Sequence, residues 1–122
     1  MATNTAKPSL DQKRAAYAWK KVQGQNDEYT KLAKGTPAFI MNNGLMQTLA
    51  FYRDKGKQHH IAINKHMIDW LAAYLTGSEN TTVSFEDMME SLQNANSQKY
   101  RKATEETLAL LRWIRQFAAI SQ

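Results

Sequence analysis

The chain has 122 residues, of which 43% are hydrophobic and 22% charged, and this is the size of one globular domain. It contains no cysteine, which excludes a disulfide scaffold, a thiolate zinc site and a cysteine nucleophile, and fits a reducing compartment. No apolar run approaches the roughly 20 residues that a membrane span requires, and the chain does not open with the hydrophobic region of a signal peptide. We therefore expect a cytoplasmic protein with no membrane partner.

The charge is basic overall and unevenly distributed. Sixteen Lys and Arg against eleven Asp and Glu give a formal net charge of +5. Residues 1–65 and 99–122 carry the basic excess, whereas residues 66–98 contain five acids and no Lys or Arg. A basic excess attracts polyanions, so nucleic acid is the first partner to consider. Composition alone fits equally well a charge that only keeps the protein soluble.

Apolar residues recur with a spacing near 3.6, and only five Gly and two Pro interrupt them. This pattern predicts an all-α fold, a bundle of about five or six helices. We expect a flexible N-terminus over residues 1–8 and a single helical domain over residues 9–122.

The first predicted helix covers residues 9–23, with Ser9 as its N-cap. Its core-facing flank is expected to contain Ala15, Ala18, Trp19 and Val22. Asn26 then caps a short helix, Asp27–Lys34, which Gly35 is expected to end.

Thr36 and Pro37 are typical of a helix start, and a helix over residues 37–55 is predicted. Its apolar residues surround most of its circumference, which is typical of a central helix. Gly44 inside it indicates that a neighbouring helix crosses closely. The alternative is a turn at Asn43-Gly44 that divides this segment into two helices.

Three further helices are predicted. Residues 60–76 form an amphipathic helix, and a polar loop, Gly77–Thr82, follows it. Ser84, with Asp87 three residues later, is expected to cap a short helix that ends near Asn94. Ser97 is expected to cap the last and longest helix, which ends near residue 119.

Three arginines of the last helix, Arg101, Arg112 and Arg115, fall on one side of it at about 100° per residue. Guanidinium groups form forked contacts with phosphate, whereas a solvated face with salt bridges needs interleaved acids. Only Glu105 lies near this stripe. Phosphate contact is therefore the favoured interpretation.

Two other basic groups are candidates for nucleic-acid contact. On the first helix, Tyr17 is flanked by cations and is expected to be available for stacking on a base or sugar. These cations repeat seven residues apart: Lys13, Arg14, Lys20 and Lys21. An ordinary lysine-rich exterior has the same pattern. The other group surrounds a loop and comprises Arg53, Lys55, Lys57, Lys65, His59, His60 and His66.

No motif predicts catalysis. His59, His60 and His66 lack a cysteine, an HExxH pair or a placed carboxylate to complete a metal site. The acids Glu86 and Glu90 lie at a helix start, where acids are expected for electrostatic reasons. There is no GxSxG elbow and no Gly-rich phosphate loop. We expect a protein that is not an enzyme, with no cofactor, metal or catalytic residue.

Two stretches of the chain carry a family resemblance. The run TPAFIMNNGLMQTLAF over residues 36–51, followed by Lys55, is one, and YRKATE at 100–105 with WIRQFA at 113–118 is the other. These resemble the small helical subunit of type III-B CRISPR-Cas (RAMP module, Cmr) effector complexes. The resemblance covers most of the chain from residue 11 to 119. Gln116 departs from it, because a basic residue is expected there, and the acidic segment within residues 78–96 matches nothing specific.

The resemblance implies a non-catalytic structural subunit for antiviral defence. Several copies of such a subunit stack head to tail in a ribonucleoprotein, beside the backbone subunits that hold the guide RNA, and target cleavage belongs to neighbouring subunits. The implied partners are other effector subunits, copies of the same chain, guide RNA and target RNA. The segregated basic and acidic segments would supply complementary stacking surfaces.

The expected RNA-binding residues are phosphate contacts drawn from the three basic groups. They are Lys20, Lys21, Arg53, Lys55, Lys57, Arg101, Arg112 and Arg115. Two alternatives remain. The first is a helical DNA-binding regulator or another basic nucleic-acid-binding protein, and the second is an enzyme that uses the histidines. Binding of a palindromic duplex by a symmetric dimer would favour the regulator, whereas sequence-indifferent binding of single strands would favour the RNA-binding subunit.

Overall fold

The computed structural model describes residues 6–78 and 81–121, and six helices follow one another along them. They are α1 (Leu10–Val22), α2 (Asp27–Asn43), α3 (Leu45–Lys55), α4 (Gln58–Thr76), α5 (Phe85–Asn94) and α6 (Ser97–Ile120). The predicted all-α class is confirmed, and the described residues contain no strand. Part of the expected flexible N-terminus (1–5) and part of the predicted polar loop (79–80) lie outside the described residues, as does residue 122.

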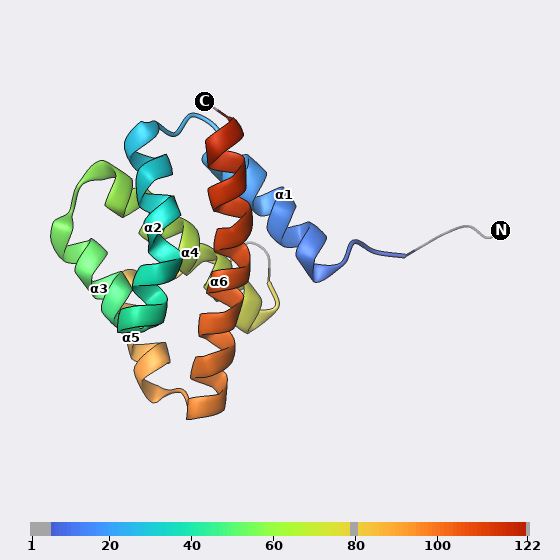
Figure 1. Ribbon diagram of the computed structural model, residues 1–122. Helices are drawn as coiled ribbons and strands as arrows, with labels where there is room; N and C mark the ends of the chain where they lie inside the picture. Colours follow the sequence, from blue (N-terminus) through green and yellow to red (C-terminus); the bar gives the residue numbers. More distant parts are fainter. Residues whose placement is uncertain (1–5, 79–80, 122) are drawn as a thin grey trace.

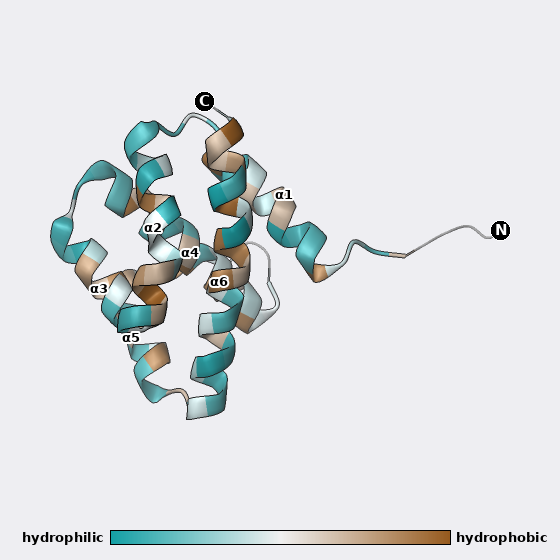
Figure 2. Ribbon diagram, in the orientation of Figure 1, coloured by the Kyte–Doolittle hydropathy of each residue, from teal (hydrophilic) through white to brown (hydrophobic). Residues whose placement is uncertain are grey.

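Helix α6 extends along the whole molecule, with α2 antiparallel beside it and α1 crossing its C-terminal half (Figure 1). At one end of this pair, Thr30 Oγ1 donates to the Ala118 carbonyl at 3.5 Å. Beyond the other end of α2, the Met46 N–H at the start of α3 donates to the Tyr100 hydroxyl of α6 at 3.1 Å. Hydrophilic and hydrophobic segments alternate along α2 and α6 (Figure 2), as two helices with one buried face require. No helix in the described part of the chain has the length and apolar character that a bilayer crossing needs.

The central helix is α4, which packs on α2, α3, α5 and α6. Nine of its residues are buried, among them Ile63, Met67 and Leu71. The prediction that residues 37–55 form the central helix is wrong, because Met41 and Phe51 project from that segment and are exposed. Its broad apolar circumference is therefore partly a solvent-facing surface.

The predicted break at Gly35 and Pro37 is also wrong, because α2 runs through both residues. Gly35 keeps a helical conformation with no positive φ. Thr36 is fully buried, and its hydroxyl donates to the Leu32 carbonyl at 2.7 Å and lies 2.9 Å from the Tyr52 hydroxyl. Burial of this turn against α3 outweighs the hydrogen bond that Pro37 cannot make.

The division falls at Gly44 instead, as the alternative interpretation predicted. Gly44 has φ 89° and ψ 160°, a conformation that is open almost only to glycine, and it separates α2 from α3. A Cβ at this position would lie 3.7 Å from the Tyr100 hydroxyl, so α6 does approach closely here. That hydroxyl accepts from the Met46 N–H, which compensates for the missing N-cap side chain of α3.

Three of the predicted N-caps are confirmed, because Ser9, Asn26 and Ser84 each accept a hydrogen bond from a backbone N–H of the first turn. The fourth is wrong by one residue. Asn96, not Ser97, caps α6, and its side chain accepts from the Lys99 N–H at 2.8 Å. Both residue types are good N-caps, so the sequence alone does not distinguish them.

A buried ion pair joins α1, α4 and α6. Glu106 is only 4% exposed and accepts from Arg14 Nε, Arg14 Nη2 and Trp70 Nε1, each at 2.7 Å. The bond to Glu106 raises the pKa of the Arg14 guanidinium above its ordinary value. Arg14 is therefore a structural residue, and its predicted place on an outward basic face is wrong.

Candidate nucleic-acid interface

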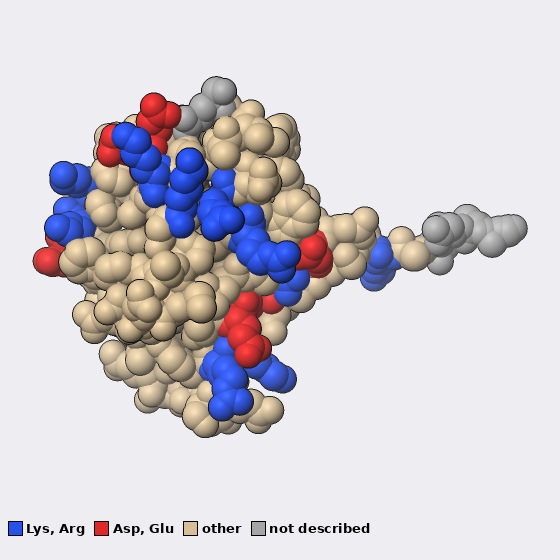
Figure 3. All heavy atoms as spheres, viewed as in Figure 1, with Lys and Arg blue, Asp and Glu red and all other residues tan. Residues whose placement is uncertain are grey.

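The exposed cations of α2 and α6 form a band across one face of the molecule (Figure 3). The only Lys and Arg of α2 are Lys31 and Lys34, and those of the C-terminal half of α6 are Arg112 and Arg115. All four are exposed. We call these four residues the α2–α6 basic band. Because the two helices are antiparallel and in contact near Thr30 and Ala118, the beginning of α2 lies level with the end of α6.

The three predicted arginines of α6 are all exposed, and within residues 6–78 and 81–121 none of them forms an ion pair. They do not form one continuous ridge. Arg101 lies near the start of α6, about 16 Å along the helix axis from Arg112 at 1.5 Å per residue. Figure 3 shows a separate group of cations at that lower end, with carboxylates between it and the band.

Sequence reasoning missed Lys31 and Lys34. The predicted helix end at Gly35 separates both lysines from the rest of α2, so the sequence gives no link between them and α6. The signal was present in their spacing of three residues, which puts both lysines on one side of a helix. What the sequence lacked was the antiparallel pairing that brings this side next to Arg115.

On α1, the expected stacking residue Tyr17 is not available. Its hydroxyl donates to the His66 carbonyl at 2.6 Å, and its ring packs on Trp70 at 4.9 Å between centroids. Burial therefore raises the pKa of Tyr17. Of the two predicted cations, Lys21 is half-buried with its Nζ 5.4 Å from the Tyr17 ring, whereas Lys20 is exposed.

Trp19 was predicted to face the core, and this is wrong. Its side chain is 48% exposed. It meets Phe117 of α6 edge to face, at 5.2 Å between centroids and 80° between planes. Phe117 in turn packs on Trp113 at 5.3 Å, and Trp113 Nε1 donates to Asp11 at 3.0 Å. We call Trp19, Phe117 and Trp113 the aromatic ladder.

The cations of the α3–α4 turn are exposed, but two of them have partners. Arg53 pairs with Glu86 at 3.0 Å, and its guanidinium lies 4.6 Å from the Phe85 ring, so it links α3 to α5. Lys55 Nζ lies 5.2 Å from the Phe51 ring. Lys57 is exposed at the N-cap position of α4, although its side chain does not cap the helix.

Two of the three histidines, His60 and His66, are buried and have lowered pKa values, so they do not add to the cationic group. His66 is buried, its Nδ1 lies 2.7 Å from the Tyr29 hydroxyl, and burial lowers its pKa to about 4. Burial also lowers the pKa of His60, and the neighbouring His59, Lys55 and Lys57 add to this effect. In the described part of the chain, no group of His, Cys, Asp and Glu has the arrangement of a metal site.

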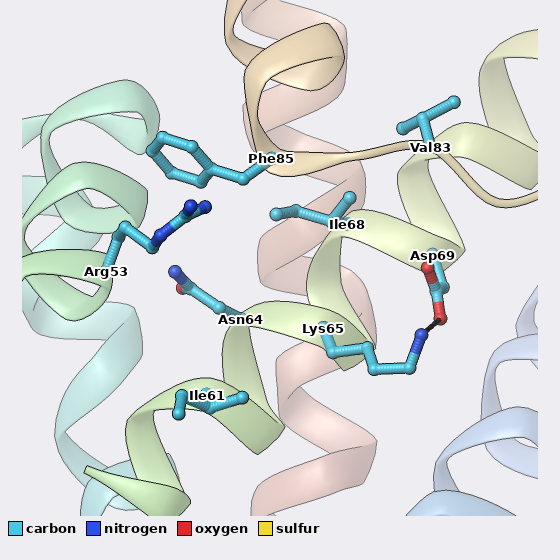
Figure 4. A pocket seen from close by; sticks show the side chains of 8 residues that line it. All are labelled: Arg53, Ile61, Asn64, Lys65, Ile68, Asp69, Val83 and Phe85. Carbon is cyan, nitrogen blue, oxygen red and sulfur yellow. Dashed lines mark hydrogen bonds and ion pairs between the residues drawn. The ribbon is translucent and has the colours of Figure 1, made fainter. Parts of the chain in front are cut away.

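A groove of about 320 Å³ lies on the outer side of α4 (Figure 4). Ile61, Asn64 and Ile68 form its floor, and Arg53 and Phe85 form one wall. Each of its cations has a carboxylate beside it, because Arg53 pairs with Glu86 and Lys65 pairs with Asp69 at 3.0 Å. This arrangement offers little to an anionic ligand, so the α2–α6 basic band is the better candidate for a polyanion.

Residues 10–121 match the family model described as CRISPR-associated protein (Cas_Cmr5). The chain belongs to the Cas_Cmr5 family. The resemblance that the sequence motifs predicted is confirmed.

A protein sequence and a solved structure, both from Thermus thermophilus, are similar to this Cas_Cmr5 chain. The protein described as CRISPR system Cmr subunit Cmr5 is 29% identical over 91 residues, which are 75% of this chain and 72% of that protein. The crystal structure of a CRISPR-associated Cmr5 family protein superimposes with a TM-score of 0.73 at 26% identity, covering 93% of this chain and 96% of that one. The overall fold is therefore shared with a solved member of the family.

Proposed function

We propose that this Cas_Cmr5 chain is a non-catalytic structural subunit of a cytoplasmic type III-B CRISPR interference ribonucleoprotein. In it, several copies stack head to tail beside the backbone subunits that hold the guide RNA, and basic surfaces of each copy contact the target strand. Family membership over residues 10–121 and the description of the Thermus relative as a Cmr subunit support a place in such a complex.

One observation carries the RNA-binding part of the proposal, namely the α2–α6 basic band. Its cations project from two rigid helices, and Arg112 and Arg115 have no ion pair with a described residue. Lys31 has only a long contact of 3.9 Å to Glu28, between two exposed side chains. Exposed pairs of this kind contribute little, so all four charges remain available to phosphates.

The non-catalytic role is supported by the way the buried polar groups are used. Glu106 holds Arg14 and Trp70, and His66 holds Tyr29, so these groups bridge helices rather than line an open cleft. Such contacts stabilise the bundle, and they leave Glu106 and His66 without the exposure that proton transfer to a substrate needs.

The salt dependence of RNA binding tests the phosphate contacts. Replacement of Arg101, Arg112 and Arg115 by alanine in the full chain should reduce the slope of log K against log salt for a single-stranded RNA. The expected reduction is about 0.7 for each phosphate that the variant no longer binds, or about 2 in all. Binding should weaken equally for unrelated sequences, because phosphate contacts carry no sequence information.

The matched control replaces the same three arginines by lysine, which keeps every charge and should keep the slope. An alanine variant with the wild-type slope would remove these arginines from the interface. A clear preference for a palindromic duplex would instead support the DNA-binding regulator.

A separate experiment tests whether this chain is part of the effector complex. A tagged copy of the chain should co-purify with a large particle that contains RNA and other effector subunits, and several copies should be present in each particle. Recovery as a lone protein without RNA from cells that make the other subunits would contradict the proposal.

A further inference from the structure

Each of the two tryptophans of the aromatic ladder has an exposed cation next to it in the sequence. Lys20 follows Trp19 on α1 and is exposed, and Arg112 precedes Trp113 on α6 and is exposed. Arg112 lies close enough to Asp11 of α1 for its charge to act on that carboxylate, which places Arg112 at the junction of α1 and α6. The pKa of Asp11 is lowered first by its hydrogen bond from Trp113, then by Arg14, and more weakly by the charge of Arg112. The ladder is thus continuous with one edge of the α2–α6 basic band.

The outermost ring of the ladder is held in a fixed place yet remains open. Trp19 is nearly half exposed, while Phe117 supports it edge to face and Trp113 supports Phe117. Trp113 is itself fixed by its bond to Asp11. A ring that is already ordered loses little conformational entropy when a ligand packs on it.

We propose that Trp19 is a stacking platform for a base of single-stranded RNA, with the flanking phosphates bound by Arg112 and Lys20; this inference rests on the RNA binding proposed above. Proteins that bind single strands without sequence preference combine a cationic track with aromatic side chains on which bases stack. The structure thus assigns to Trp19 the stacking role that the sequence assigned to Tyr17.

Charge decides between RNA and a protein partner for this surface. Asp11 already interacts with a donor group of α1, on Arg14, and with one of the ladder, on Trp113. The cations on either side of the ladder therefore favour a polyanion. Ile120, which is exposed one turn beyond Phe117, extends the apolar surface, so docking of a protein is the competing outcome.

The experiment compares two single-stranded probes of equal length, an oligoadenylate RNA and an abasic oligonucleotide with the same phosphates. The full chain should bind the oligoadenylate more tightly. Trp19→Ala should weaken that binding by about 5- to 150-fold, which corresponds to the roughly 1–3 kcal/mol of one stacked base, and should leave abasic binding unchanged. Trp19→Phe should restore most of the affinity.

The matched control is Tyr74→Ala, which removes an aromatic ring of 37% exposure from the end of α4 and should change neither affinity. Circular dichroism of each variant verifies the helical fold. Equal weakening of both probes by Trp19→Ala would contradict stacking, because the loss would then act through the phosphates.

The remaining outcomes separate this inference from the proposed function. If Arg112→Ala with Arg115→Ala weakens RNA binding but Trp19→Ala does not, the stacking platform is wrong and the RNA-binding function stands. If Trp19→Ala changes only self-association in sedimentation, the ladder is a protein-docking surface. If the chain binds neither probe, both proposals fail.

Discussion

Arg14 and Arg112 are the same residue type at the junction of α1 and α6, but their surroundings differ completely. The Arg14 guanidinium is bound to buried Glu106 at 2.7 Å, whereas Arg112 is exposed and has no ion pair with a described residue. The first helps to build the fold, and the second is available to a partner. A count of positive charges therefore overestimates the size of a binding surface, because it includes cations such as Arg14 that are held in internal ion pairs.

The largest expected effect concerns the buried pair. Arg14→Met should destabilise the protein by about 3–5 kcal/mol, because it leaves the Glu106 carboxylate buried and unpaired. Urea unfolding followed by circular dichroism measures this change. The double variant Arg14→Met/Glu106→Gln removes the buried charge but keeps an acceptor for Trp70, and it should be more stable than the single variant. Equal stability of the two would show that the charge is not what costs free energy.

The pH dependence of stability tests whether buried His66 is neutral in the folded protein. Its pKa is about 4 in the fold and 6.5 in the unfolded chain, so the unfolded state binds the extra proton first as the pH falls. The contribution of neutral His66 to the free energy of unfolding is therefore fully present above pH 6.5. It falls by about 3 kcal/mol as the pH decreases to 4.

His66→Asn keeps an acceptor near the Tyr29 hydroxyl but does not titrate. Its free energy of unfolding should therefore vary much less than that of the wild type between those two pH values. Parallel curves for the two proteins would contradict a buried, neutral His66.

Substitution of Gly44 and Gly35 by alanine tests how backbone conformation affects stability in α2 and α3. Gly44→Ala should destabilise the protein by about 1–3 kcal/mol, because φ is 89° there and an L side chain is strained. Gly35→Ala is the control, since Gly35 is helical with open space around it, and it should stabilise by about 0.5–1 kcal/mol. Thermal unfolding measures both. A stabilising Gly44→Ala would place a continuous helix across residue 44.

The smallest effect on stability is expected for the exposed arginines. Arg112→Ala with Arg115→Ala should change the free energy of unfolding by less than about 0.5 kcal/mol, because neither side chain holds another described group in an ion pair. Chemical unfolding of this double variant measures the change. A loss as large as that of Arg14→Met would mean that these arginines build the fold.

Local signals in the sequence were sufficient for the fold class and most helix ends. Ser9, Asn26 and Ser84 each cap the helix that follows, since a cap depends on residues three apart. Gly35 and Pro37 were misleading because burial of Thr36 against Tyr52 outweighs their local preferences. That contact joins residues from two helices, and no local pattern contains it.

The candidate site was predictable only in part, because exposure depends on tertiary packing. The arginines of α6 could be found from helical spacing alone. The roles of Tyr17 and Trp19 were exchanged, because their positions on α1 differ by about 200° and the sequence does not show where α4 lies. Lys31 and Lys34 were missed since only the antiparallel pairing of α2 and α6 brings them to the arginines.

Crosslinking of RNA to protein by ultraviolet light in a purified effector particle tests the central claim most directly. Peptides that carry a crosslinked nucleotide are identified by mass spectrometry. The account predicts crosslinks on the α2–α6 basic band, within residues 31–34 or 112–115. Crosslinks confined to the α3–α4 turn, or RNA-bearing peptides from every other subunit and none from this chain, would contradict it.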